Sequence, residues 1–457
     1  MSRNRLLAAG RSPGRRPTAG GGEESDEELT EQTSHRVRMQ ARRTLVLCQR
    51  SDWVAVDQSL KSLERAALEG RLGPSPLQGI VDEREFTPLM FAARDNRLAV
   101  IDKMIELGCD INHVNQEGMT VLHMAVLNGK EDMVKALLNK KADIYARAEP
   151  KQMTCVHLAC TRISAVGVLR LLLQQLKVDT ARLSEDADGN IPLFLATEVG
   201  ALQVCKELLG SEAEQQVLYR KRSGDTVLHM AAHRRDLDLA KLFIEHGAKV
   251  NAQNGDGQTA LHVAAAEGDE CMVKYLHSLE ADAAILDSHD RTALHVAAEH
   301  GYTLVVETLA DKFKASMLDR TKDGDTLLHI AARSGHPGAV VAAIKKGLPL
   351  RMPNKSGMRA IHQAALEGHG PVIAALIQNG ELVDTTCRGG LTSLHLAAGA
   401  GQTAAVEALL GHGAHMERKA GGSSPQGISF KAGGQSGSDA RPTRAVSGMA
   451  TVNEWGY

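Results

Sequence analysis

Aromatic residues and long apolar runs are both scarce in this sequence of 457 residues. Aromatics make up 3% of the chain, whereas glycine alone accounts for 43 residues. Many thin layers of small residues suit such a composition better than one thick core filled with large rings. No apolar run approaches the roughly 20 residues needed to cross a bilayer, so the sequence predicts no membrane span in this chain.

A net charge and a disulfide framework are also missing. The formal net charge is −2, which gives no overall field favouring nucleic acid or a membrane surface. We therefore expect no nucleic-acid partner. The 7 cysteines are odd in number and scattered, which indicates reduced thiols and a cytoplasmic location.

The N-terminal region changes character twice. Its first 22 residues are rich in arginine and lack acids, and the acidic run Glu23–Glu28 follows at once. This segregation of charge predicts a disordered tail over residues 1–41. Residues 42–81 are apolar with helical spacing, and we interpret them as a degenerate first repeat that caps an array, with Trp53 as its packing anchor.

The central part of the chain repeats itself. The pattern Thr-x-Leu-His, followed by x-Ala-Ala or a close variant, recurs with a period of 33 to 37 residues. Its first position, here called the anchor, is residue 87, 120, 154, 191, 226, 259, 292, 326, 359 or 392. This period and this signature are those of ankyrin repeats.

Each position of the repeat has a physical role. Thr259 is placed to cap a helix, Ala264 and Ala265 allow close packing, and Gly268 is placed to end the helix in a left-handed conformation. A second apolar helix follows, and an Asp256-Gly257 pair predicts the tight turn of a protruding finger.

The sequence thus predicts an all-α ankyrin-repeat solenoid, with helix-turn-helix repeats and β-hairpin fingers. Ten repeats occupy residues 82–416. The period then stops, and residues 417–457 form a Gly/Ser-rich stretch that we expect to be a disordered tail. We interpret this abrupt end as an array that has been cut short.

Residues that suggest chemistry have a structural explanation. Histidine recurs in the motif in eight of the ten copies, but successive copies one helix layer apart, about 8–10 Å, are too distant to share one zinc ion. Cys155, His157 and Cys160 form the one cluster with metal-like composition. They occupy slots where small residues pack, so we expect no metal, no cofactor and no enzyme activity.

Binding capacity is then expected on the fingers and the concave face. Several fingers are basic, and those of neighbouring layers are expected to stack into a strip that attracts an acidic partner, with ordinary solvated charge as the alternative. The candidate partner-binding residues are Arg220, Lys221, Arg222, Arg320, Lys322, Arg351, Lys355 and Arg359.

Some stretches go beyond the general ankyrin pattern. They are Asp311–Ser316, Arg320–Gly324, Met352–Lys355, Asp188–Leu193, and Asp52-Trp53 with Val56–Gln58. With these stretches, the region from Arg42 to Gly413 resembles the N-terminal ankyrin region of the TRPN family, the no-mechanoreceptor-potential-C mechanosensory channels.

The resemblance implies a mechanical function. Members of that family are tetrameric membrane channels, and their ankyrin array is a cytoplasmic tether that links the channel to microtubules. It implies microtubules as the partner here, bound through the basic fingers at the cytoplasmic face of a membrane. This chain departs from the family because its sequence predicts no pore. The alternative is a free, soluble ankyrin adaptor that recruits an unrelated protein.

Overall fold

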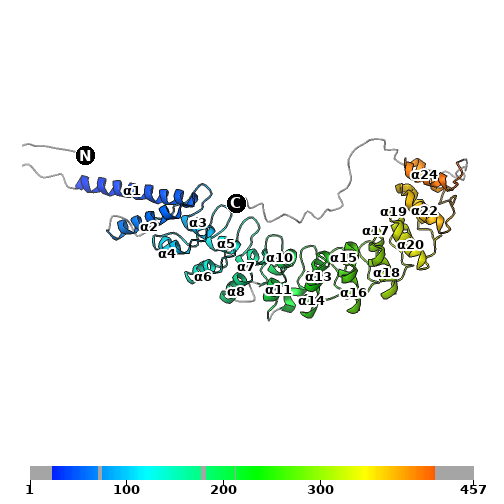
Figure 1. Ribbon diagram of the computed structural model, residues 1–457, viewed down its shortest axis with the longest axis horizontal. Coiled ribbons are helices and arrows are strands. Elements are labelled where there is room, and N and C mark those ends of the chain that lie inside the picture. Colours follow the sequence, from blue (N-terminus) through cyan, green and yellow to red (C-terminus); the bar gives the residue numbers. More distant parts are fainter. Residues whose placement is uncertain (1–22, 70–74, 177–181, 211–212, 417–457) are drawn as a thin grey trace, which may run out of the picture.

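The computed structural model describes residues 23–69, 75–176, 182–210 and 213–416. In these residues the chain forms consecutive pairs of antiparallel helices that stack side by side into a curved array (Figure 1). Helices pack against their counterparts in the next pair, as α15 packs on α17 and α16 on α18. The first helix of each pair lies on the concave side of the curve, and the second lies on the convex side.

Ten of these pairs coincide with the ten anchors, so the described residues confirm the predicted ankyrin-repeat solenoid. The pairs are α3 (Pro88–Arg94) with α4 (Leu98–Glu106), α5 (Val121–Leu127) with α6 (Glu131–Asn139), α7 (Cys155–Cys160) with α8 (Val166–Gln175), α10 (Pro192–Val199) with α11 (Leu202–Leu208), α13 (Val227–His233) with α14 (Leu237–Glu245), α15 (Ala260–Glu267) with α16 (Glu270–Ser278), α17 (Ala293–Glu299) with α18 (Thr303–Lys312), α19 (Leu327–Arg333) with α20 (Pro337–Lys345), α21 (Ala360–Glu367) with α22 (Gly370–Gln378), and α23 (Ser393–Gly399) with α24 (Thr403–Gly411). One further short helix, α12 (Ala213–Leu218), precedes α13.

The helix boundaries follow from the residues at the ends. Thr259 is the N-cap of α15 in extended conformation, and Gly268 ends the helix with φ +69°. A left-handed residue at this place closes the last turn and is accessible to glycine at little cost. The second helix, α16, begins at the capping side chain of Asp269 and buries Met272, Val273 and Leu276 against its neighbours.

A pair of helices also precedes the first anchor, and here the predicted boundary is corrected. Helix α1 (Glu23–Gln49) begins well before residue 42, so residues 23–41 are helical and not a disordered tail. The physical reason is an apolar stripe in which Ala41, Leu45 and Cys48 are buried and Val37 is half-buried. The rest of the predicted tail, residues 1–22, and the predicted tail over 417–457 lie outside the described residues.

Helix α2 (Trp53–Leu68) completes this first pair and packs on α1 and α4. Trp53 contacts the core, as expected for the cap, and its indole N–H donates to Asp95 Oδ2 of the first repeat at 3.1 Å. The pair therefore covers the N-terminal face of the stack.

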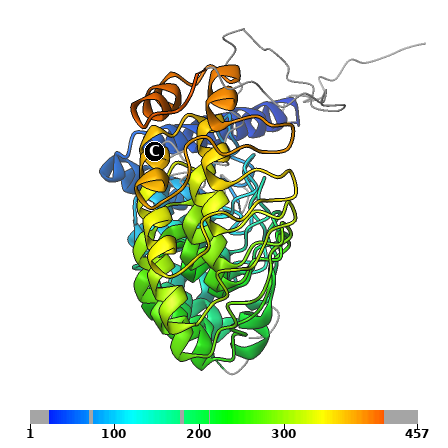
Figure 2. The same ribbon diagram turned by 90° about the vertical axis from the view of Figure 1, so that its right-hand side faces the viewer.

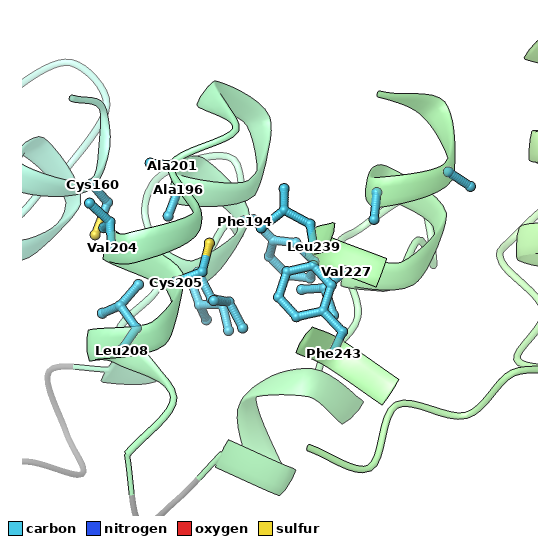
Figure 3. Close-up of a cluster of buried hydrophobic side chains, with 14 of the residues drawn as sticks. Cys160, Phe194, Ala196, Ala201, Val204, Cys205, Leu208, Val227, Leu239 and Phe243 are labelled. Carbon is cyan, nitrogen blue, oxygen red and sulfur yellow. The ribbon is translucent and has the colours of Figure 1, made fainter. Parts of the chain in front are cut away.

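The core runs continuously from pair to pair. In Figure 3 Phe194 of α10, Val227 of α13, and Leu239 and Phe243 of α14 gather between two consecutive repeats. All four side chains are fully buried. Because each repeat buries its apolar face against its neighbours, stability depends on stacking and not on any single unit.

The fingers differ from the prediction in detail. They project along one edge of the array as a row of loops (Figure 2). In the described residues they contain no strands, and the only ladder pairs there are the isolated bridges Ala148–Met153 and Thr386–Thr392. The arms are too short to form a β-hairpin, and the loop is closed by a side chain instead.

Candidate functional site

An Asn or Asp side chain builds each of several fingers. Asn254 Oδ1 accepts from the backbone N–H groups of Asp256, at 3.1 Å, and Gln258, at 2.9 Å. Asp287 makes the same two contacts one repeat later, both at 2.9 Å. This residue stands five positions before the anchor, also as Asn115, Asp186 and Asn354. The Asp-Gly pair identified in the sequence follows it, and this side chain was missed although its position recurs at the repeat period.

The motif histidines connect each repeat with the next finger. In α15 the backbone N–H of Thr259 donates to His262 Nδ1 at 3.2 Å, so Nδ1 is the unprotonated nitrogen. The Nε2–H then donates to the Arg291 carbonyl at 3.1 Å. The same link joins His157 to Asn190, His229 to Gln258, His295 to Asp319, His329 to Met358 and His362 to Thr385.

Burial and this bonding keep the imidazoles neutral. Desolvation lowers the pKa of His262, although the carbonyl of Arg291 acts in the opposite direction. Burial lowers the pKa of His123 and of His362 to about 4. A proton on Nδ1 would also remove the acceptor of the Thr N–H bond. These histidines therefore hold the array together and offer no free metal ligand.

The cluster Cys155, His157 and Cys160 is part of the core. Both thiols are fully buried, and desolvation raises the pKa of each. His157 Nδ1 accepts from the backbone N–H of Thr154 at 3.2 Å, while Nε2 faces the Asn190 carbonyl at 3.1 Å. In the part of the chain that the structure describes, no three His, Cys, Asp or Glu side chains gather as a metal site.

Several candidate arginines hold neighbouring fingers together. Arg320 donates through Nη1 to the Pro353 carbonyl of the next finger, at 2.9 Å. Arg220 makes the equivalent contact with the Gln253 carbonyl, and Gln253 in turn donates to the Leu286 carbonyl at 3.1 Å. These side chains form bridges between layers, a role that sequence reasoning missed.

Other candidates are also engaged. Arg359 pairs with Glu381, whose side chain is 1% exposed, at 3.0 Å. Arg351 donates to the Gly380 carbonyl at 3.2 Å. The Lys221 ammonium lies 5.6 Å from the centroid of the Phe194 ring. These contacts restrain the side chains without neutralising most of them, so a role in partner binding stays a prediction.

The predicted strip forms in part. Lys322 and Lys355 are exposed on adjacent fingertips, and Lys355 Nζ donates to the Lys322 carbonyl at 2.6 Å. The other group of candidates lies apart, in the finger before α13, where Arg222 is exposed. Arg388 extends the row to the next finger and was not identified in the sequence, although it too stands four residues before its anchor.

Among the residues described, no helix combines the length and the apolar character that a bilayer crossing requires.

Comparison with known proteins agrees with this geometry. The family model for ankyrin repeats (three copies) matches residues 65–148, 193–287, 228–321, 264–348 and 328–420. The chain is 29% identical over 208 residues to the neurogenic locus notch homolog protein 1 of Mus musculus, covering 40% of this chain and 8% of that protein. It is 30% identical over 178 residues to the B-cell lymphoma 3 protein homolog of Mus musculus, covering 38% of this chain and 39% of that protein.

The chain thus spans only part of the length of these relatives. The matched family model covers more than half of the chain, and it coincides with the stacked helix pairs. Ankyrin arrays present fingers and a concave face to other proteins, so this array is a protein-binding scaffold. The chain belongs to the ankyrin-repeat family.

Proposed function

We propose that this scaffold acts as a cytoplasmic tether, similar to the array of a TRPN channel, and that it binds microtubules through its basic fingers. The observation that carries the proposal is the pair of exposed ammonium groups of Lys322 and Lys355 on adjacent fingertips. A repeating acidic surface is the kind of partner that such a row attracts.

The architecture is suited to transmitting force. The stack is continuous from α1 to α24, and adjacent layers are joined by histidine links as well as by apolar packing. A pull at one end is therefore passed from repeat to repeat through identical contacts. The stretches quoted above for the TRPN resemblance lie within this same stack.

Co-sedimentation of the full chain with stabilised microtubules tests the proposal. We expect the chain to pellet with microtubules at low ionic strength and to be released as salt is added, because contacts between exposed charges are screened. A chain that stays in the supernatant at every salt concentration would overturn the microtubule proposal. Arg351→Glu with Lys355→Glu should weaken pelleting if the fingers carry the contact.

A free adaptor for an unrelated protein is the second candidate. The row of fingertips favours it equally, since an exposed charged edge requires only an acidic partner and not a polymer. The two candidates differ in the pelleting assay, because an adaptor would not sediment with microtubules.

A further inference from the structure

Three cations stand in register on consecutive fingers. Lys322, Lys355 and Arg388 each lie four residues before an anchor, and all three are exposed. We call these three residues the cationic edge. Adjacent fingers are tied at this height, because the Lys355 backbone N–H donates to the Asp323 carbonyl at 3.1 Å.

Glycines support the side chains of this edge. Gly324 and Gly357 both have positive φ, +77° and +73°. A Cβ built on Gly324 would lie 2.9 Å from Lys355 Cγ, and one on Gly357 would lie 2.8 Å from Arg388 Cγ. The methylene stem of each cation therefore lies across the bare glycine of the preceding finger. This contact fixes the stem and reduces the rotamer entropy that a partner would otherwise have to remove.

The surroundings of the edge keep it positive. Asp325 lies at the base of the finger, but it is 2% exposed and its carboxylate is bound by Arg333, at 3.0 Å, and by Asn354, at 2.7 Å. Asp323 is the exposed carboxylate beside Lys322. Arg320 adds a further exposed positive charge, although two carbonyls orient it. Cations thus outnumber free carboxylates on these fingertips.

We propose that the cationic edge binds an extended acidic segment of a partner protein, which runs along the fingertips across the layers. This proposal deepens the proposed scaffold function and rests on it for the claim that the partner is a protein. Stacked helical layers are about 8–10 Å apart. An extended chain covers that distance in about three residues, at about 3.3 Å each, so a carboxylate at every third position meets one cation per finger.

The edge fits carboxylates better than nucleic acid. It offers three cations across three layers, whereas a nucleic acid strand presents a phosphate about every 3.4 Å and is bound by dense basic surfaces. Asp323 within the row would repel a phosphate backbone, whereas a protein segment can place a neutral or basic residue opposite it. The net charge of −2 also provides no general attraction for a polyanion.

Fluorescence anisotropy with a labelled peptide (Glu-Gly-Gly)5 tests the inference on the full chain. We expect saturable binding at low salt, weakened about tenfold in the triple variant Lys322→Gln, Lys355→Gln and Arg388→Gln. The matched control removes three exposed cations elsewhere, Lys135→Gln, Lys206→Gln and Arg222→Gln. Arg222 is the most stringent of these, because its stem lies over Gly189 in the same way but its neighbouring fingers carry Ala187 and Gly255.

The control triple should bind the peptide within about twofold of the parent chain. Equal weakening in both triples would show a diffuse charge effect and overturn the inference, as would no binding by the parent chain. Tighter binding of a single-stranded RNA than of the peptide, lost in the edge triple, would assign the surface to nucleic acid instead. If the edge triple unfolds by circular dichroism, Arg388→Gln alone replaces it, with Arg222→Gln alone as its control.

The outcomes separate this inference from the microtubule proposal. Peptide binding without pelleting on microtubules would support the cationic edge and reject the microtubule partner. Pelleting that the edge triple leaves unchanged would support the tether and reject the edge as its contact.

Discussion

The guanidinium of Arg359 lies 3.0 Å from a carboxylate oxygen of Glu381, and the two residues replace the usual pair of side chains at their positions. Arg359 stands at an anchor where most repeats have threonine, and Glu381 stands 22 residues later at a buried slot. The residues at the equivalent slot in other repeats are Ala142, Ala248, Ala281, Leu348 and Ala414. The acid and the base therefore compensate each other within the ninth repeat.

This relationship predicts a strongly non-additive pair of substitutions. Arg359→Thr should destabilise the array by about 3 kcal/mol, because it leaves the carboxylate of Glu381 buried without a partner. Glu381→Ala should cost less, since the Arg359 side chain is 27% exposed and can reach water. The double variant restores the common pattern and should be more stable than Arg359→Thr alone. Urea unfolding of the four proteins measures the coupling, and strictly additive changes would contradict it.

The sequence predicted the repeat architecture because each layer obeys the same local rules. Threonine caps, paired alanines and terminal glycines recur at every period, and the structure uses them as expected. Arg359 shows where this reasoning failed. It was assigned to a binding strip because charge on a finger was assumed to face solvent, yet its partner is 22 residues away across a helix pair. Only the fold brings such residues together.

The N-terminal boundary failed for a related reason. The charge segregation of residues 1–41 concealed the stripe that begins at Val37 and continues through Ala41, Leu45 and Cys48. A stripe that starts within polar residues gives a weak local signal, and its partners are α2 and α3, which are distant in the sequence. Arg388 could have been found, because its position relative to the anchor matches that of Lys322 and Lys355.

The motif histidines predict an acid-sensitive array. Their pKa values are lowered in the folded state, first by desolvation, so the unfolded chain binds more protons than the folded chain below about pH 6.5. Their contribution to stability is complete above that pH and is lost progressively as the pH falls toward the folded pKa values, which are about 4 for His123 and His362. The others with a lowered pKa are His157, His229, His262, His295 and His329.

Urea midpoints at pH 7.5, 6.5 and 5.5 measure this dependence. Each histidine that stays neutral when folded contributes about 1.4 kcal/mol per pH unit within that window, so a cooperative array should lose several kcal/mol. Replacing His262 and His295 with Gln should lower stability at pH 7.5 and flatten the slope. A midpoint that does not change between pH 7.5 and 5.5 would rule out the histidines as the cause.

Two glycines in the array should respond differently to the same substitution. Gly268 and Gly347 both have positive φ, +69° and +88°. A Cβ on Gly268 would lie 2.4 Å from the ring of Tyr302, whereas a Cβ on Gly347 would have no heavy atom within 4 Å. Gly347→Ala should cost about 1 kcal/mol for its backbone conformation alone. Gly268→Ala should cost about 2–3 kcal/mol, since the ring must also move. Equal losses in thermal or urea unfolding would contradict the steric part of this argument.

The junction between the cap and the first repeat depends on Asp95. Its Oδ2 accepts from Ser51 Oγ at 2.5 Å and from Trp53 Nε1 at 3.1 Å, and Arg97 lies 5.6 Å from the Trp53 ring. Burial alone would raise the pKa of Asp95, but the hydrogen bonds from Arg94, Ser51 and Trp53 outweigh it and hold the pKa below its usual range. The carboxylate thus stays charged and connects α2 to the end of α3.

Asp95→Ala should therefore loosen the cap. In a Trp455→Phe background Trp53 is the only tryptophan, so its emission reports on this junction directly. We expect a red shift as the indole loses its acceptor and meets water, with a stability loss of about 2 kcal/mol because a hydrogen-bonded charge is removed. Asp102→Ala is the control, since Asp102 is 65% exposed and pairs with Lys140 on the surface. A red shift of equal size in the control would mean that Trp53 responds to any loss of charge nearby, and the specific role of Asp95 would be rejected.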